Sequence, residues 1–388
     1  MSRTQDPDLA GCAEPRRGHV RTFYAAAHVV ADPSAPQGPG LPATLDWDAT
    51  LAFRHHLWSL GLGVADAMDT AQRGAGLDWG ATRELIRRSG AEARAVGGRL
   101  ACGAGTDQLG RAASSSSGSA SSPSRASAAR ELDRIVAAYE EQIAVVEDAG
   151  AQVVLMASRA LAAVARDASD YADVYGRLLP QLRKPAILHW LGTPFDPALA
   201  GYWGSSDLDE AAGHVLAIIR GNCAKVDGVK VSLLDADREI ALRRALPAGV
   251  RLYTGDDFDY PRLIRGDAQG FSHALLGVFD PIAARAADAL AALDCGDAER
   301  FDAILVPTLP LARHLFAAPT RHYKTGLVFL AFLAGHQDHY TMVGGAQKER
   351  SLAHLAELYA LAESAGILPD PELAAARAHA VLGGGVAR

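Results

Sequence analysis

The sequence predicts an α/β fold, a (β/α)₈ TIM barrel followed by a C-terminal helical appendage. Its 388 residues exceed the usual single core and suit such a barrel with an extension. Short strand-like runs recur with helical patterns between them, which is the order of parallel β-α-β units. After the eighth run only helical patterns remain, and they are more than a closing barrel needs.

Eight runs account for the predicted barrel strands. Each is a short β-like segment separated from the next by a helical pattern. In chain order they are RTFYAAAHVV from Arg21, GVADAMDT from Gly63, RLACGAG from Arg99, AQVVLMAS from Ala151, PAILHW from Pro185, VDGVKVSL from Val226, VRLYTGDD from Val250 and GFSHALLG from Gly270.

Helical patterns fill the segments between and after these runs. The clearest one between strands covers Leu132 to Asp148, with Gly150 just beyond its end. Its apolar side chains recur at helical spacing, at Ile135, Tyr139, Ile143 and Val146. The patterns after the last strand cover Asp280 to Leu293, Asp297 to Phe316, Lys324 to Ala334, Arg350 to Ala365 and Pro371 to Leu382.

Two segments interrupt the alternation. Residues 112–129, AASSSSGSASSPSRASAA, are low in complexity and carry too little apolar surface to offset the entropy of ordering. We therefore predict a disordered insertion after the third strand. Residues 1–20 form a predicted loose leader, which leaves the barrel over residues 21–295 and the helical region over residues 296–388.

Composition narrows the class of partner. The chain is 49% hydrophobic and 21% charged, with a formal charge of −7 and a pI near 6.0. This balance is that of a soluble globular protein and argues against a nucleic-acid partner. The longest apolar stretch, around Gly326 to Gly335, is too short to cross a membrane, and the N-terminus has no signal-peptide core. We predict a cytoplasmic protein with a small-molecule partner.

The cysteines and glycines give no sign of a bound group. Four cysteines, Cys12, Cys102, Cys223 and Cys295, lie far apart without a CxxC pair, so we expect reduced thiols and no zinc knuckle. No GxGxxG or P-loop motif occurs, so no nucleotide cofactor is predicted.

Lys230 is the main indication of chemistry. It lies well inside VDGVKVSLLD, residues 226–235, flanked by apolar residues. Lysine is almost never fully buried without a partner, so a lysine inside a buried strand suggests an amine uncharged enough to attack a carbonyl. The alternative is a lysine near a strand end whose ammonium group reaches water.

Three segments carry a resemblance to a known family. VDGVKVSLLD, YTGDDFDYPRLIRGDAQGFSHALLG and RHYKTGLVFLAFLAG match in order and spacing the second half of the group. The chain resembles the dihydrodipicolinate synthase and N-acetylneuraminate lyase family, as a divergent branch of unassigned substrate. The resemblance implies a class I aldolase-type barrel, a Schiff-base lysine at Lys230, and assembly as a homodimer or homotetramer.

The chain departs from that family at three turns. The glycine-threonine-threonine-glycine-glutamate turn after strand two is replaced by residues 69–73, DTAQR, which retains one threonine, Thr70, and introduces Asp69. The relay tyrosine of strand five is replaced by His189. The tyrosine-bearing segment after strand four is replaced by Ser158 and Arg159.

These residues give a predicted mechanism and binding set. Lys230 attacks a ketone or aldehyde, and the protonated imine becomes an electron sink for an adjacent bond. His189 is the predicted general acid and base, although a core histidine is the alternative. The predicted substrate-binding residues are Asp69, Thr70, Ser158, Arg159, Asp256, Asp257 and Ser272. For one of the two aspartates a helix cap is the alternative, and for Arg159 a surface salt bridge.

Two other functional classes remain open from the sequence. One is a metal-dependent barrel aldolase or isomerase, for which the histidines of HQDH, residues 336–339, and the pair His55 and His56 are the candidates. They show no recognised metal spacing, and no metal site is predicted. The other is a non-catalytic barrel that binds a sugar acid. Retention of Lys230 favours the imine-forming enzyme.

Overall fold

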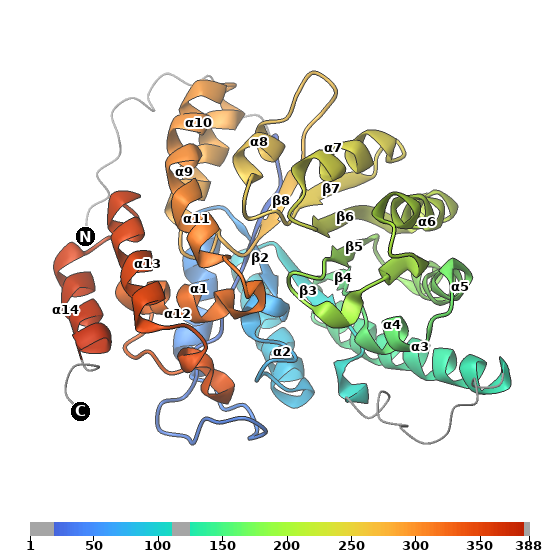
Figure 1. Cartoon of the computed structure of the whole chain (residues 1–388), viewed down its shortest axis with the longest axis horizontal. Coiled ribbons are helices and arrows are strands. Elements are labelled where there is room, and N and C mark those ends of the chain that lie inside the picture. The colour runs from blue at the N-terminus through green and yellow to red at the C-terminus, as the bar shows by residue number, and fades with distance from the viewer. Residues whose placement is uncertain (1–18, 111–124, 384–388) are drawn as a thin grey trace.

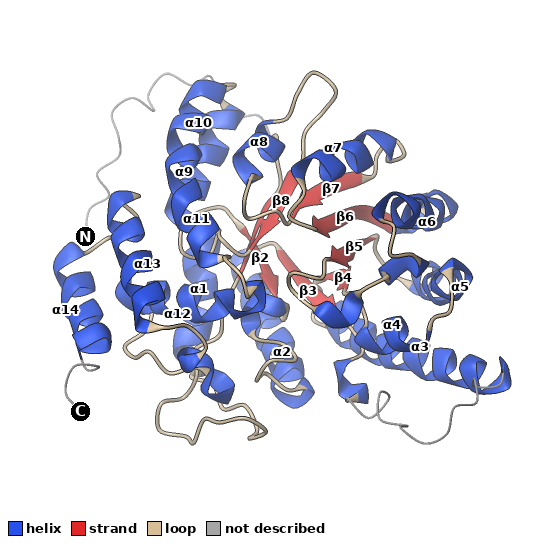
Figure 2. Ribbon diagram, viewed as in Figure 1, coloured by secondary structure: helices blue, strands red, loops and turns tan. Residues whose placement is uncertain are grey.

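The computed structural model describes residues 19–110 and 125–383. Eight parallel strands form a closed barrel in sequential order, and β8 pairs with β1 to complete it (Figures 1 and 2). The predicted (β/α)₈ fold is confirmed; seven predicted runs contain one strand each, and the fifth strand extends one residue beyond its run, to Leu191. The strands are β1 (Phe23–Ala26), β2 (Gly63–Asp66), β3 (Leu100–Ala104), β4 (Gln152–Leu155), β5 (Ala186–Leu191), β6 (Val226–Ser232), β7 (Arg251–Thr254) and β8 (His273–Leu276).

The strands separate two apolar layers because their side chains alternate between the barrel interior and the helices. A small inner cluster fills the barrel and includes Tyr24, Ala65, Ile187, Tyr253 and Leu275. The outward side chains join a much larger cluster with the surrounding helices. Because both faces of each strand are buried, the strands are apolar runs that can be recognised in the sequence.

The barrel helices lie outside the strands (Figure 2). They are α1 (Trp47–Ser59), α2 (Trp79–Val96), α3 (Arg125–Asp148), α4 (Arg159–Val164), α5 (Ala168–Leu178), α6 (Leu208–Gly221), α7 (Ala236–Ala245) and α8 (Tyr260–Arg265). Aspartate side chains cap several of them; Asp46 accepts from the Ala49 N–H, and Asp78 accepts from the Ala81 N–H.

Helix α3 corrects the predicted extent of the serine-rich insertion. Residues 112–124 lie outside the described residues, but residues 125–129 belong to α3. Ala128 is buried, and alanine is the strongest helix former, so this end of the segment joins the helix. The helix ends as predicted, with Gly150 just beyond it in a left-handed conformation at φ 79°.

The predicted C-terminal helical region is present. Its helices are α9 (Ala283–Asp294), α10 (Ala298–Leu305), α11 (Leu309–Leu315), α12 (Tyr323–Leu333), α13 (Leu352–Ser364) and α14 (Pro371–Leu382). Every residue of α12 is buried, and α12 contacts both α13 and α14. In Figure 1, α12, α13 and α14 lie on the side of the molecule where α1 and α9 are.

Residues 1–18 of the predicted leader lie outside the described residues, whereas the Val20 N–H donates to Asp294 at 2.8 Å, which fixes this residue to α9.

The expectation of reduced thiols holds for Cys102 and Cys223 but is wrong for Cys295, which is disulfide-bonded.

No single helix among the described residues is long and apolar enough to cross a membrane. The segments Ala298–Leu315 and Thr320–Leu333 reach that length and hydropathy only as a pair, and they meet at an angle of 107°.

Candidate active site

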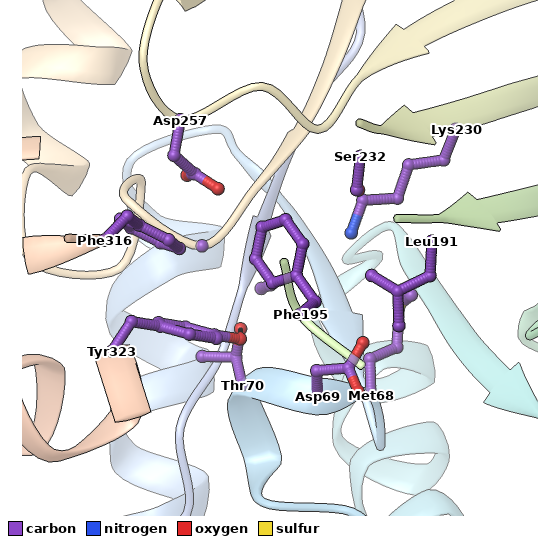
Figure 3. A pocket seen from close by; sticks show the side chains of 12 residues that line it. Met68, Asp69, Thr70, Leu191, Phe195, Lys230, Ser232, Asp257, Phe316 and Tyr323 are labelled. Atoms are coloured by element: carbon purple, nitrogen blue, oxygen red, sulfur yellow. Dashed lines mark hydrogen bonds between the residues drawn. The ribbon is translucent and has the colours of Figure 1, made fainter. Parts of the chain in front are cut away.

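Lys230 lies on β6 with its side chain inside the barrel, and Figure 3 shows its Nζ pointing into a cavity. In the register of the sheet it lies opposite His189 of β5 and Tyr253 of β7. Its exposed fraction is 9%. Burial lowers the pKa of the Lys230 amine, while the charges of Asp69 and Asp257 act in the opposite direction. More of this amine is therefore neutral near pH 7 than in an ordinary lysine, which favours attack on a carbonyl.

The cavity around Lys230 is small and closed by aromatic rings. Its volume is about 20 Å³, enough for about one water molecule. Phe316 stacks on Tyr323 with ring centroids 4.4 Å apart, and Phe195 meets both rings edge-on (Figure 3). The lining residues are Ala26, Met68, Asp69, Thr70, Leu191, Phe195, Lys230, Ser232, Asp257, Gly277, Phe316 and Tyr323.

Ser232 connects His189 to this cavity. The Ser232 Oγ lies 3.2 Å from the Nε2 of His189, which is fully buried and does not itself line the cavity. Burial, followed by the charge of Lys230, lowers the pKa of His189 well below its usual value, so the imidazole is neutral. Its Nδ1 has no hydrogen-bond partner among the described residues. The Ser232 hydroxyl therefore lies between the Nε2 of His189 and the cavity.

The turn after β2 brings Asp69 and Thr70 to the cavity. Both belong to a short 3₁₀ helix, Asp69–Ala71, and Thr70 Oγ1 forms a 2.8 Å hydrogen bond with the Tyr323 hydroxyl. Arg73, another departure from the family turn, is buried and donates to the Gly103 carbonyl at 2.6 Å and to Asp107. Arg73 therefore supports the turn from behind, and Asp69 and Thr70 face the cavity.

Asp256 and Asp257 have different partners. Asp256 accepts from the N–H groups of Phe258 and Asp259 at 2.8 and 3.1 Å, so it orders the turn before α8. Asp257 accepts from the Val278 N–H at 2.9 Å and lines the cavity. Burial raises the pKa of Asp257 to about 7, and the charge of Lys230 acts against this shift. Asp257 thus has a pKa suited to proton transfer near neutral pH.

Besides Asp256, three further predicted binding residues do not line the cavity. The Ser158 hydroxyl accepts from the Leu161 N–H at 3.0 Å and caps α4. Arg159 is 55% exposed and is paired with Asp196. The Ser272 hydroxyl donates to Glu239 at 2.8 Å, between the barrel and α7. Their polar groups are engaged in local structure, which sequence spacing alone does not reveal.

Several residues of the cavity were not predicted. Ser232 follows Lys230 by two residues on the same face of a strand, so strand alternation is a signal from which it could have been predicted. Tyr323, Phe195 and Phe316 reach the cavity from a loop and from the C-terminal region, and no local pattern marks them. Lys324, beside Tyr323, is also buried, and burial lowers its pKa.

The histidines considered as metal ligands pack as rings. His336 lies 4.9 Å from the Phe53 ring and 4.7 Å from the His56 ring, measured between centroids. Within residues 19–110 and 125–383, no group of three or more histidine, cysteine, aspartate or glutamate side chains is arranged to hold a metal ion.

A family model described as "Protein of unknown function (DUF993)" matches residues 4–385. The chain belongs to the DUF993 family. A comparison with curated proteins gives no match for this DUF993 member.

Solved structures with this architecture carry the name of dihydrodipicolinate synthase. YagE, a prophage protein of the dihydrodipicolinic acid synthase family from E. coli K12 solved in complex with pyruvate, is 12% identical, with a TM-score of 0.66 and coverage of 90% of this chain and 99% of that chain. Dihydrodipicolinate synthase from Thermotoga maritima is 14% identical, with a TM-score of 0.64 and coverage of 90% and 100%. The enzyme from Aquifex aeolicus is 11% identical, with a TM-score of 0.64 and coverage of 90% and 99%. In all three cases the similar part makes up 90% of this chain and at least 99% of the solved chain.

Proposed function

We propose that this DUF993 protein is an imine-forming, class I lyase, aldolase or hydro-lyase that acts on a small 2-oxo acid or oxidised sugar. One observation carries the proposal: a buried lysine of lowered pKa faces a closed cavity together with a carboxyl group whose pKa is about 7. A neutral amine and a group able to exchange protons are the two requirements of imine chemistry.

The proposed steps begin with attack of the Lys230 amine on the substrate carbonyl carbon, forming a C–N bond. The carbonyl oxygen takes up two protons, one of them from the attacking nitrogen, and leaves as water, which produces a protonated imine.

For a lyase or aldolase, the hydroxyl on the β-carbon loses its proton, the bond between the α- and β-carbons breaks, and its electron pair moves into the imine to form an enamine while the β-carbon leaves as an aldehyde or ketone. Protonation of the α-carbon and addition of water to the imine then release the product and restore the amine. For a hydro-lyase, loss of a proton from the α-carbon forms the enamine, whose electron pair expels the protonated β-hydroxyl as water before a second water releases the product from the imine.

Asp257 is the proposed proton donor and acceptor at the cavity, because it is near half-protonated at neutral pH and lies beside Lys230. Ser232 and His189 form a second route that leads away from the cavity. Asp69 and the hydroxyl pair of Thr70 and Tyr323 are proposed to bind the polar groups of the substrate. Ser158, Arg159, Asp256 and Ser272 are left out because their polar groups are engaged elsewhere.

The size of the cavity supports a small substrate. With a volume of about 20 Å³, the cavity admits a substrate only if the rings of Phe195, Phe316 or Tyr323 move apart. Pyruvate, the ligand named for YagE, is among the smallest 2-oxo acids and supports this class of substrate.

Borohydride trapping tests the proposal. Intact and peptide mass spectrometry after treatment with pyruvate, longer 2-oxo acids and oxidised sugars should detect a reduced adduct on Lys230 and identify the carbonyl compound. Lys230→Met should remove the adduct. Lys324→Met is the matched control, because Lys324 is also a buried lysine of lowered pKa and should not be needed for trapping.

An adduct that forms equally in the Lys230→Met variant contradicts the mechanism. Saturable binding of one of these ligands with no adduct on any lysine supports a non-catalytic binding protein instead.

We also propose that the protein is cytoplasmic and forms a homodimer or homotetramer. Sedimentation equilibrium of the full chain measures the number of subunits.

A further inference from the structure

The lining of the Lys230 cavity is short of positive charge. Its charged side chains are Lys230, Asp69 and Asp257, and the described residues contribute neither an arginine nor a histidine to it. Imine formation joins the Lys230 nitrogen to the carbonyl carbon of the substrate, so this nitrogen is not available as a separate ion-pair partner. Two carboxyl groups and no second cation therefore face the group that lies beside that carbonyl.

Asp69 is the lining carboxylate that is free to bind a substrate. It is partly buried, and its carboxylate forms neither a hydrogen bond nor an ion pair with the residues that the structure describes. The charge of Asp69 opposes the effect of burial on the pKa of Lys230, and it adds to the effect of burial in raising the pKa of Tyr323. Figure 3 shows all three side chains around the same cavity. A carboxylate only accepts hydrogen bonds, so its partner on the substrate must be a donor such as a hydroxyl group.

The neighbouring cations do not compensate for these carboxyl groups. Lys324 is buried, which lowers its pKa against the charges of Asp69 and Glu349, and it does not line the cavity. Arg159 is 55% exposed, is paired with Asp196, and does not line the cavity either. A substrate carboxylate beside the imine would therefore meet like charges without a counter-ion, and this repulsion is strong where water is excluded.

We propose that the substrate of this site is an uncharged, hydroxylated ketone or aldehyde, and that Asp69 selects it against 2-oxo acids. The inference rests on the proposed imine chemistry of Lys230 and specifies its substrate class. Asp69 accepts a hydrogen bond from a hydroxyl group beside the carbonyl. The hydroxyl pair of Thr70 and Tyr323 lies at the same turn and can bind a second hydroxyl group, while Leu191 contributes an apolar wall for the carbon chain.

Competition between two carbonyl compounds that differ at one group tests the inference. Hydroxyacetone and pyruvate are both three-carbon chains with a central ketone, but hydroxyacetone has a hydroxymethyl group where pyruvate has a carboxylate. The full chain is treated with both compounds and cyanoborohydride at neutral pH, with Nα-acetyllysine present as a free amine. Peptide mass spectrometry measures the two reduced adducts on Lys230. We expect the ratio of the hydroxyacetone adduct to the pyruvate adduct to be about tenfold higher on Lys230 than on the free amine.

Asp69→Asn should lower the ratio on Lys230 by about tenfold, because it replaces the charge with a neutral group of the same shape. The substitution also changes the Lys230 amine, but this change acts on both compounds alike, so the ratio isolates the charge of the substrate. Asp173→Asn is the matched control and should leave the ratio unchanged. Asp173 is an exposed aspartate of α5 outside the cavity, and its partner Arg177 keeps Asp133 at 2.9 Å.

A ratio on Lys230 that is no higher than on the free amine overturns the inference and leaves the imine chemistry standing. A preference for hydroxyacetone that persists in Asp69→Asn, or that Asp173→Asn reduces equally, overturns the selective role of Asp69. Trapping of neither compound on Lys230 overturns the proposed function together with this inference.

Discussion

At the residue scale, Ser232 is a contact between His189 and the cavity of Lys230. The neutral imidazole of His189 lies opposite Lys230 in the pairing of β5 with β6, and its Nε2 lies 3.2 Å from the Ser232 hydroxyl, which lines the cavity. Gly255 leaves room for Lys230 and Ser232, because a Cβ at this position would lie 2.2 Å from Ser232 Oγ and 2.8 Å from Lys230 Cε. A larger residue at position 255 would therefore displace both side chains.

Replacing Ser232 should slow proton transfer without preventing imine formation. We expect Ser232→Ala to reduce the exchange of protons at the carbon next to the trapped carbonyl by roughly 10²-fold, the lower end of the usual contribution of such a group. The borohydride adduct on Lys230 should remain. Proton exchange into D₂O followed by NMR measures the rate for whichever compound is trapped.

Ser272→Ala is the control for this change. Ser272 is an equally buried serine, but its hydroxyl donates to Glu239 and does not line the cavity. If Ser232→Ala and Ser272→Ala slow proton exchange to the same extent, Ser232 has no specific role in proton transfer.

The burial of Lys230 inside the barrel could be predicted from the sequence, because a charged residue within an apolar strand-like run stands out from its neighbours. The roles of Arg159 and Ser272 could not, since Asp196 and Glu239 are brought to them by tertiary contacts. The cap that Ser158 forms with the Leu161 N–H is local, three residues along the chain. A polar residue near a strand end can cap a helix or face the cavity, and the sequence alone does not distinguish these outcomes.

At the scale of elements, Glu239 links α7 to β7 and to the segment before β8. Its two carboxyl oxygens accept from the hydroxyls of Thr254 and Ser272, at 2.9 and 2.8 Å. Burial raises the pKa of Glu239 to about 8. The folded protein therefore holds a proton that the unfolded chain, with a glutamate pKa near 4.3, has released at neutral pH.

This bound proton should make stability depend on pH. Because the folded pKa is above the unfolded one, the stabilisation is complete below pH 4.3 and is lost as the pH rises toward 8. Between these pH values, the raised pKa of Glu239 should lower the free energy of unfolding by up to about 1.4 kcal/mol for each unit by which the pH rises. Glu239→Gln should remove this slope while keeping a neutral side chain of the same shape. Urea unfolding at several pH values between 5 and 8 measures both slopes.

Equal slopes for the parent and for Glu239→Gln would mean that the carboxyl is ionised in the folded state. Glu357→Gln is the control, because Glu357 is an exposed glutamate on α13 and should leave the slope unchanged.

The elements themselves were largely predictable. The strands are apolar runs because helices cover one face and the barrel core covers the other, and the helices carry recognisable periodicity and caps. The predicted insertion extends too far, over residues 125–129, because this alanine-rich sequence is low in complexity. Composition does not show that Ala128 is buried or that Leu132 follows it in the same helix.

At the scale of the whole molecule, the C-terminal helical region completes the candidate active site. Phe316 follows α11 and Tyr323 begins α12, yet both line the cavity with Lys230 of the barrel. The hydrogen bond between Thr70 and Tyr323 joins positions that are 253 residues apart in the chain. Long separations of this kind are why the aromatic wall of the cavity could not be predicted, although the barrel and the helices were.

The same contact predicts that barrel and C-terminal helices unfold as one unit. We expect one unfolding transition, with near-UV and far-UV signals that coincide, because α12 is buried along its whole length and its first residue, Tyr323, is bonded to Thr70 of the barrel.

Thr70→Val and Tyr323→Phe each remove one partner of the hydrogen bond, and each should cost about 1 kcal/mol. In a double-mutant cycle their effects should not add; the coupling should be about 0.5–1.5 kcal/mol, since either change already breaks the bond. Thr325→Val with Thr70→Val is the control pair, because Thr325 is a buried α12 residue that bonds to the Ala346 carbonyl instead, at 2.9 Å. Two separate transitions, or additive effects in both pairs, would show that the helical region is an independent unit and that the contact between Thr70 and Tyr323 does not join it to the barrel.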